Sequence, residues 1–189
     1  MLATQNPIES EGVYALPEAQ RDRFLMQIVV NQPTYVEELE IARRMGVRPP
    51  HAAQMLTLEQ LVELQDAVDE VFVHHAVQDY AVRLVMATRD PVTWQVPDIA
   101  PHVGLGASPR ATLGLLAAGR ALALLRGRRF LVPQDVADVA PEILRHRLIL
   151  TYDALAEGVT TDDVIGRILA TMPVPQVTPR QESGLQDTA

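Results

Sequence analysis

Hydrophobic side chains recur three and four positions apart over most of the chain after Pro33, which is the spacing of amphipathic helices. Capping boxes mark the start of two of these helices. In a capping box, a threonine and a side chain three residues later satisfy free backbone amides. The two boxes begin at Thr34 and Thr57. The helix after Thr34 should end at Gly46. The helix after Thr57 and the next helix along the chain should each bury one face.

The helix that begins after Ser108 is predicted to be central to the core. Ser108 is a favourable N-cap residue, and Pro109 follows at the first helical position, where the missing amide costs little. From Arg110 to Arg126, alanine and leucine occupy most sides of the helix, which is typical of a buried helix. A stripe of apolar residues over 75–88 predicts another helix with one buried face.

Two more helices are predicted towards the C-terminal end. One begins near Pro133, and Pro141 should kink or split it, because proline lacks an amide donor and clashes with the preceding turn. The other runs from Thr161 to about Thr171. Beyond Pro173 the sequence is polar and contains further proline, so we expect a disordered tail.

The first part of the chain mixes strand and loop signals. Residues 1–4 read as the end of a strand, and residues 26–30 read as a buried strand. Two such strands cannot form an independent sheet. Either the chain is a piece of a larger protein, therefore, or these strands pack on helices. The predicted fold class is mainly α, with one or two strands at the N-terminus.

Proline and glycine suggest where the chain divides. Residues 90–106 contain three prolines and two glycines, which is typical of a loop or hinge. We therefore predict an N-terminal part (1–33), connecting helices with a hinge (34–106), a helical domain (107–172) and a tail (173–189). No repeat of fixed period is present in the sequence, which disfavours a solenoid.

Composition narrows the class of protein. The chain has 189 residues, of which 48% are hydrophobic and 21% charged, as in folded globular proteins. The longest apolar run lies between Arg110 and Arg120 and is far shorter than the roughly 20 residues of a membrane span. The chain contains no cysteine, which excludes disulfides and thiolate zinc sites, and the five histidines lack metal-binding spacing. No signal peptide is visible at the N-terminus, so we expect a cytoplasmic protein without a metal site.

All 16 basic side chains are arginine, and lysine is absent. This excludes Schiff-base chemistry and the phosphate loop G-x-x-x-x-G-K-[ST], because both require a lysine. The charge is unevenly spread: residues 1–106 carry 15 acidic and 7 basic side chains, whereas residues 107–150 carry 3 acidic and 7 basic ones. The basic segment could face nucleic acid, nucleotide phosphates or an acidic partner.

Three residues are candidates for phosphate chemistry. Asn6 follows the first predicted strand, where a neutral amide could orient a water, although Asn-Pro is also an ordinary turn. Arg23 ends a short helix and could reach the phosphates of a neighbouring subunit, but the residues alone favour a surface ion pair between Asp22 and a neighbouring arginine. Arg110 lies in the first turn of a helix, where a cation is unfavourable unless an anion binds or solvent screens it.

In four motifs, which cover about 150 residues, the chain resembles the C-terminal half of MoxR-type AAA+ ATPases. The motifs are Ala3-Thr-Gln-Asn-Pro-Ile-Glu-Ser-Glu-Gly12, Leu16-Pro-Glu-Ala-Gln-x-Asp-Arg-Phe24, Gly106-Ala-Ser-Pro-Arg-Ala111 and Leu144-Arg-His-Arg-Leu148. The resemblance implies that Asn6 is the sensor 1 residue, which positions the attacking water. It also implies that Arg23 is the arginine finger offered to the next subunit, and that Arg110 is the sensor 2 arginine, which contacts the γ-phosphate of ATP.

The resemblance further implies a helical lid over 107–172, joined to a remnant of the nucleotide-binding core in residues 1–33. The sequence lacks the phosphate loop, the Walker B acidic residues and most strands of that core. We therefore expect a fragment that senses ATP but does not hydrolyse it alone. In the full-length protein, the family implies ATP and Mg²⁺, a homo-oligomeric ring, expected to be a hexamer, and chaperone-like remodelling of client proteins or metal-cofactor insertion into them.

Two alternatives remain open. Arg21 stands where the family usually has an aliphatic residue, so it is a second candidate for the finger. The chain could instead be a stand-alone helical interaction module that binds nucleic acid or a partner protein through residues 107–150. The basic run of Arg126, Arg128 and Arg129 contains no interleaved aromatic residue, which disfavours stacking on single-stranded nucleic acid.

Overall fold

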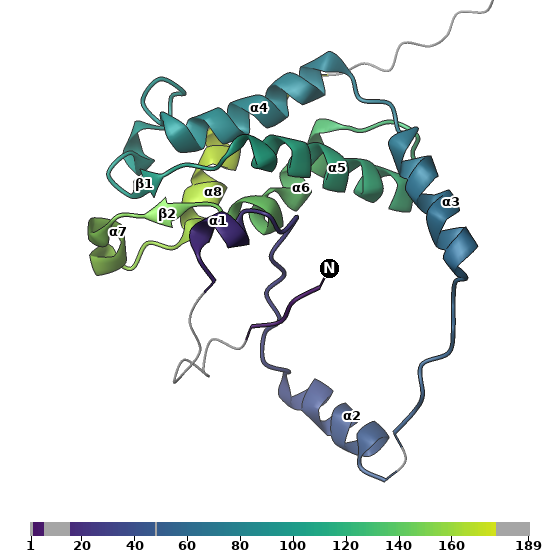
Figure 1. Cartoon of the computed structure of the whole chain (residues 1–189). Coiled ribbons are helices and arrows are strands. Elements are labelled where there is room, and N and C mark those ends of the chain that lie inside the picture. The colour runs from purple at the N-terminus through teal and green to yellow at the C-terminus, as the bar shows by residue number, and fades with distance from the viewer. Residues whose placement is uncertain (1, 6–15, 48, 177–189) are drawn as a thin grey trace, which may run out of the picture.

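A computed structural model describes residues 2–5, 16–47 and 49–176 of the chain. Within these residues the fold is mainly helical, as the sequence predicted (Figure 1). Its elements are α1 (Glu18–Arg21), α2 (Tyr35–Met45), α3 (Leu58–Asp69), α4 (His75–Arg89), a 3₁₀ helix (Pro97–Ile99), β1 (Val103–Leu105), α5 (Pro109–Leu125), α6 (Pro133–Leu144), β2 (Ile149–Leu150), α7 (Tyr152–Glu157) and α8 (Thr161–Thr171).

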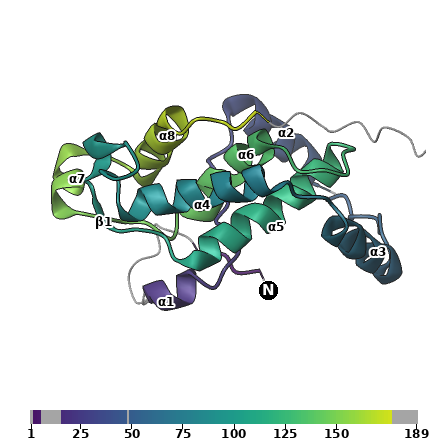
Figure 2. The ribbon, with the colours of Figure 1, turned by 90° about the horizontal axis from the view of Figure 1, so that it is seen from above.

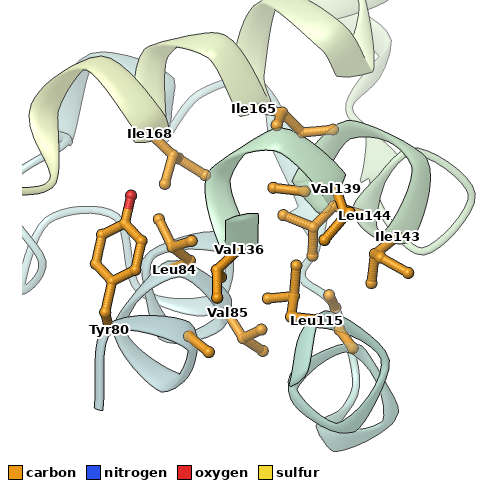
Figure 3. Packing of buried hydrophobic residues seen from close by; sticks show 14 of the residues in the cluster. Tyr80, Leu84, Val85, Leu115, Val136, Val139, Ile143, Leu144, Ile165 and Ile168 are labelled. Atoms are coloured by element: carbon orange, nitrogen blue, oxygen red, sulfur yellow. The ribbon is translucent and has the colours of Figure 1, made fainter. Parts of the chain in front are cut away.

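The core is built from α4, α5, α6 and α8, with α5 packed against both α4 and α6 (Figures 1 and 2). Leu84, Leu115, Ile143 and Ile168, one from each of these helices, are completely buried and converge in the interior (Figure 3). Burying a side chain of this size stabilises the fold by about 1.5–3 kcal/mol. The central place predicted for the helix after Ser108 is therefore confirmed.

The predicted helix starts are confirmed by their caps. The Thr34 hydroxyl accepts the backbone amide of Glu37, whose carboxylate accepts the amide of Thr34 at 2.8 Å. Thr57 and Gln60 form the same reciprocal pair at the start of α3. Such contacts depend only on residues within one turn, which explains why the sequence predicts them correctly.

Of the two effects predicted for Pro141, a kink or a split, the split does not occur. The helix continues through the proline to Leu144. Val136 and Val139 before the proline, and Ile143 after it, all bury into the same core. Burial on both sides of the proline outweighs the loss of one helical hydrogen bond.

The two strands predicted near the N-terminus are not formed in the described residues. Residues 2–5 and 26–30 have no strand partner, and Ile28, Val29 and Val30 are exposed. The backbone amide of Gln27 donates instead to the Glu142 carbonyl of α6, at 2.8 Å. At Gln27, therefore, the segment contacts α6, but its apolar residues 28–30 do not pack on a helix as a buried strand would.

The sheet of the structure lies elsewhere in the chain. β1 and β2 pair antiparallel, with Val103 opposite Leu150 and Leu105 opposite Ile149. β1 and the 3₁₀ helix both fall in the stretch that the sequence predicted as a loop or hinge. The sequence also missed α7, which is only six residues long.

The prediction that α3 buries one face is wrong. None of its residues is buried, and Leu58 is 79% exposed. Like α3, α2 contains no buried residue, and it stands apart from the core in Figure 1. An amphipathic pattern shows that a face is suited to burial, but burial also needs a partner that covers it. α3 contacts α5 without burying any of its residues.

Candidate functional site

Arg23 and Arg110 lie at one cleft, although they are far apart in the sequence. The cleft has a volume of about 240 Å³ and lies between the turn after α1 and the first turns of α5. Its lining consists of Asp22, Arg23, Phe24, Leu25, Arg110, Leu113, Gly114, Ala117 and Arg147. Arg23 and Arg110 are the exposed cations of this open cleft, and guanidinium groups beside an apolar wall suit an anionic ligand.

The N-terminus of α5 is held in place by the end of α4. A Cβ atom on Gly106 would lie 2.4 Å from the Thr88 carbonyl oxygen, so only glycine allows this close approach. The amide of Ala107 donates to the Thr88 hydroxyl at 2.9 Å, and Arg89 Nε donates to the Ala107 carbonyl at 2.7 Å. These contacts position the turn that carries Arg110.

The carboxylate of Asp22 lies at the N-terminus of α5. It accepts the Ser108 hydroxyl at 2.9 Å, Arg110 Nη1 at 3.0 Å and Arg147 Nε at 3.1 Å. Burial alone would raise the pKa of Asp22, but the hydrogen bonds from Arg110 and Ser108 and the charge of Arg147 outweigh it and lower that pKa. The sequence indicated that a cation in this first turn calls for an anion, and Asp22 provides one from within the chain.

Arg147 anchors the segment around Arg23 to the end of α6. Its side chain is only 2% exposed. Besides the Asp22 carboxylate, its guanidinium binds the backbone carbonyls of Asp22, Phe24 and Leu25 at 3.2, 2.5 and 3.0 Å, and that of Ile143. Burial lowers the pKa of Arg147, and the nearby Asp22 carboxylate opposes that effect.

The two candidates for the finger differ in their surroundings. Arg23 is exposed, lines the cleft, and makes no side-chain hydrogen bond to the residues that the structure describes. Arg21 is half-buried, and its Nε is buried without a hydrogen-bond partner in that same part of the chain. Asn6, the predicted sensor 1 residue, lies outside the described residues.

His146 packs beside this anchor. Its Nε2 lies 3.1 Å from the Phe24 carbonyl, to which it donates, whereas Nδ1 is buried without a partner among the described residues. Burial, together with the positive charge of Arg147, lowers the pKa of His146. The sequence pointed to Arg23 and Arg110 but missed the roles of Asp22, His146 and Arg147, although all three lie within the quoted motifs.

Acidification is expected to destabilise the fold through His146. Because the native state resists protonation of this ring, the unfolded chain binds the extra proton first, so stability is lost as the pH falls through the ordinary histidine pKa of about 6.5. One group of this kind changes the free energy of unfolding by at most about 1.4 kcal/mol per pH unit. Urea titrations at about pH 7.5 and about pH 5.5 should show a smaller loss for His146→Gln than for the parent chain. An equal loss in both would contradict this explanation.

The arginine run at the end of α5 is largely neutralised within the chain. Asp135 is completely buried and accepts Arg126 at 2.8 Å and Arg128 at 2.6 Å. Arg126 also pairs with Asp138 at 2.6 Å. These pairs link the α5–α6 connection to the first turns of α6. They therefore give Arg126 and Arg128 a structural role and provide no support for a nucleic-acid surface here.

Two other classes of site are absent from the described residues. They contain no group of three histidine, cysteine, aspartate or glutamate side chains arranged to hold a metal ion. None of the helices described is long and apolar enough to cross a membrane. The arginine-lined cleft is therefore the candidate functional site of the described residues.

Two family models match the chain. Residues 98–168 match the AAA lid domain, and residues 1–26 match the ATPase family associated with various cellular activities (AAA). The first match contains Arg110, and the second contains Asn6 and Arg23. Each of the three predicted site residues thus falls in a segment that one of the two family models matches.

Individual relatives agree with these matches. The chain is 54% identical over 184 residues to Chaperone MoxR1 of Mycobacterium tuberculosis, covering 97% of this chain and 49% of that protein. It is 32% identical over 193 residues to Protein MoxR of Methylorubrum extorquens, covering 93% and 55%. The chain therefore spans about half the length of the curated relatives it matches.

A solved structure shows the same fold. The crystal structure of a proposed ATPase from Cytophaga hutchinsonii superposes with a TM-score of 0.85 at 34% sequence identity, covering 91% of this chain and 53% of that one. Fold, motifs and sequence identity agree. The chain belongs to the MoxR-type AAA+ ATPases and matches the end of their ATPase core together with the helical lid.

Proposed function

We propose that this chain is the ATP-sensing part of a MoxR-type AAA+ ATPase. The observation that carries the proposal is that Arg23 and Arg110, the arginines assigned by the family resemblance, line the same cleft. Phosphoryl transfer depends mainly on positioning and on cations that stabilise charge in the transition state, and arginine provides a permanent charge with a planar set of donors.

Each predicted residue has a distinct role in this proposal. Arg110 contacts the γ-phosphate from the lid, and Arg23 is the finger offered to the nucleotide of a neighbouring subunit. The exposure of Arg23 at the cleft, compared with the half-buried Arg21, supports this choice of finger. Asn6 positions the attacking water, a role that rests on the resemblance alone.

The described residues fit part of the cofactor that the family implies. The guanidinium groups of Arg23 and Arg110 suit the phosphates of ATP. The described residues offer no set of three ligands for Mg²⁺, and the sequence contains no lysine for a phosphate loop. We therefore propose that ATP and Mg²⁺ are held mainly by an ATPase core of the kind that the longer relatives possess.

For the whole protein, we propose a homo-oligomeric ring, expected to be a hexamer, because a finger that acts on a neighbour requires a repeating interface. One relative is named a chaperone, which supports remodelling of client proteins as the work that ATP hydrolysis drives. Insertion of a metal cofactor into clients rests on the family resemblance alone. We place this activity in the cytoplasm. We also propose 1–33 as core remnant and 107–172 as lid. The predicted connection, 34–106, ends in α4, which packs in the same core as the lid helices.

The 189-residue chain alone is expected to show no ATP turnover above background. Without a phosphate-loop lysine or a set of metal ligands in the described residues, it lacks the groups that hold and activate the triphosphate. A phosphate-release assay with MgATP would measure this, using Arg110→Ala as the comparison. Turnover by the parent chain that this variant abolishes would overturn the proposed division between sensing and hydrolysis.

A further inference from the structure

We propose that Arg147 is a positioning residue that holds both Arg23 and Arg110 at the cleft. This inference rests on the proposed function, because it assigns a role to Arg147 through the two arginines that would contact nucleotide. Arg147 itself stays buried behind them. Its place three residues after the end of α6 ties the cleft to the core of the lid.

The link to Arg23 runs through the backbone. The guanidinium of Arg147 binds the carbonyls of residues 22, 24 and 25, so it grips the chain on both sides of Arg23. His146 binds the Phe24 carbonyl as well. The backbone of Arg23 is thereby anchored to the lid, while its side chain remains exposed and free to reach a ligand.

The link to Arg110 runs through one carboxylate. Arg147 Nε binds Asp22 Oδ1, and Arg110 Nη1 binds Asp22 Oδ2. The Ser108 hydroxyl lies 2.9 Å from both oxygens and shares its one proton between them. The Asp22 carboxylate thus bridges the two arginines across contacts that span 88 and 125 positions of sequence.

Only arginine can make this set of contacts. Its planar guanidinium carries five N–H donors that point in fixed directions, whereas lysine presents three donors from a single nitrogen. A buried cation is costly unless acceptors surround it, and here one carboxylate and four carbonyls do so. Lysine at this position would keep the charge but could not reach the carboxylate and the separated carbonyls together.

Arg147→Lys in the full 189-residue chain tests the proposal. The amide of Gln27, which binds the Glu142 carbonyl, reports on the anchored segment. We expect its hydrogen exchange to accelerate at least about tenfold, because local opening becomes easier, while amides within α5 and α6 keep their protection. In NMR spectra of the arginine side chains, the hydrogen bond to Asp22 should slow rotation of the Arg110 guanidinium and give separate Nη signals in the parent chain. In the variant these signals should merge into one average.

Two further variants separate the parts of the proposal. Asp22→Asn leaves the carbonyl contacts of Arg147 available, so it should release the Arg110 signals but leave the exchange of Gln27 within about threefold of the parent. Arg167→Lys is the matched control, because Arg167 forms an exposed ion pair with Asp98 away from the cleft. It should change neither readout. Asp22→Asn also provides a test if Arg147→Lys fails to fold.

An activity measurement separates this inference from the proposed function. In a chimera that joins the upstream half of M. tuberculosis MoxR1 to this chain, Arg147→Lys should lower kcat for ATP at least tenfold, with KM changed less than about twofold. Unchanged Gln27 exchange and Arg110 signals in a folded Arg147→Lys chain would overturn the positioning role, even if the chimera depends on Arg23 and Arg110. If the chimera hydrolyses ATP regardless of Arg23 and Arg110, the proposed function fails instead, whatever the exchange data show.

Discussion

Replacing Arg23 by alanine is expected to lower the ATP turnover number of the MoxR1 chimera by about 10³-fold or more, which is the effect typical of removing an arginine finger. Arg23 is exposed at the cleft and makes no side-chain hydrogen bond to the described residues, so its removal should leave the fold intact. Steady-state phosphate release would measure kcat, and binding of a fluorescent ATP analogue would show whether affinity is retained.

Two controls sharpen this measurement. Arg21→Ala should reduce kcat far less, because Arg21 is half-buried and does not line the cleft. Mixing Arg23→Ala subunits with subunits that lack the Walker B acidic residues should restore part of the activity, since a finger acts on its neighbour's nucleotide. Equal losses for Arg21 and Arg23, or no recovery on mixing, would contradict the assignment of Arg23.

Leu115→Ala is expected to destabilise the fold by about 3–4 kcal/mol. Leu115 is completely buried where α5 contacts α6, so truncation both removes buried apolar surface and leaves a cavity. Urea titration of the 189-residue chain, followed by far-UV circular dichroism, would give the change in the free energy of unfolding. This loss would be a large fraction of the total stability of an average domain.

Leu113→Ala is the matched control for this prediction. It makes the same substitution two residues earlier on α5, where the side chain is 68% exposed. Its cost should stay within about 1 kcal/mol, because little apolar surface leaves water when this residue folds. Similar losses for both variants would contradict the burial of this face of α5.

The helices were predictable where their signals are local, and the N-terminal strands were not. The Thr34 and Thr57 capping boxes need only residues of the same turn, and both form. The state of residues 26–30 depends on a neighbouring strand, which no hydrophobic pattern can supply. The face of α3 follows the same logic, since its apolar spacing is correct but its contact with α5 leaves every residue of the helix unburied.

The site was predictable as far as its motifs reach. Arg23 and Arg110 stood out because short motifs of a known family contain them. The contact of Arg147 with Asp22 did not, because it joins side chains 125 positions apart and its importance appears only when both are placed in space. A buried arginine is also hard to recognise from sequence, since arginine is usually exposed.

The order in which the ribosome makes the chain adds a consequence of this long-range contact. During synthesis, Arg23 emerges long before Arg147, so the segment around Arg23 has nothing to dock on until α6 and Arg147 have left the ribosome. The cleft is therefore among the last parts of the nascent protein to mature. A chain whose translation stops before Arg147 would lack the contacts that hold the backbone on both sides of Arg23.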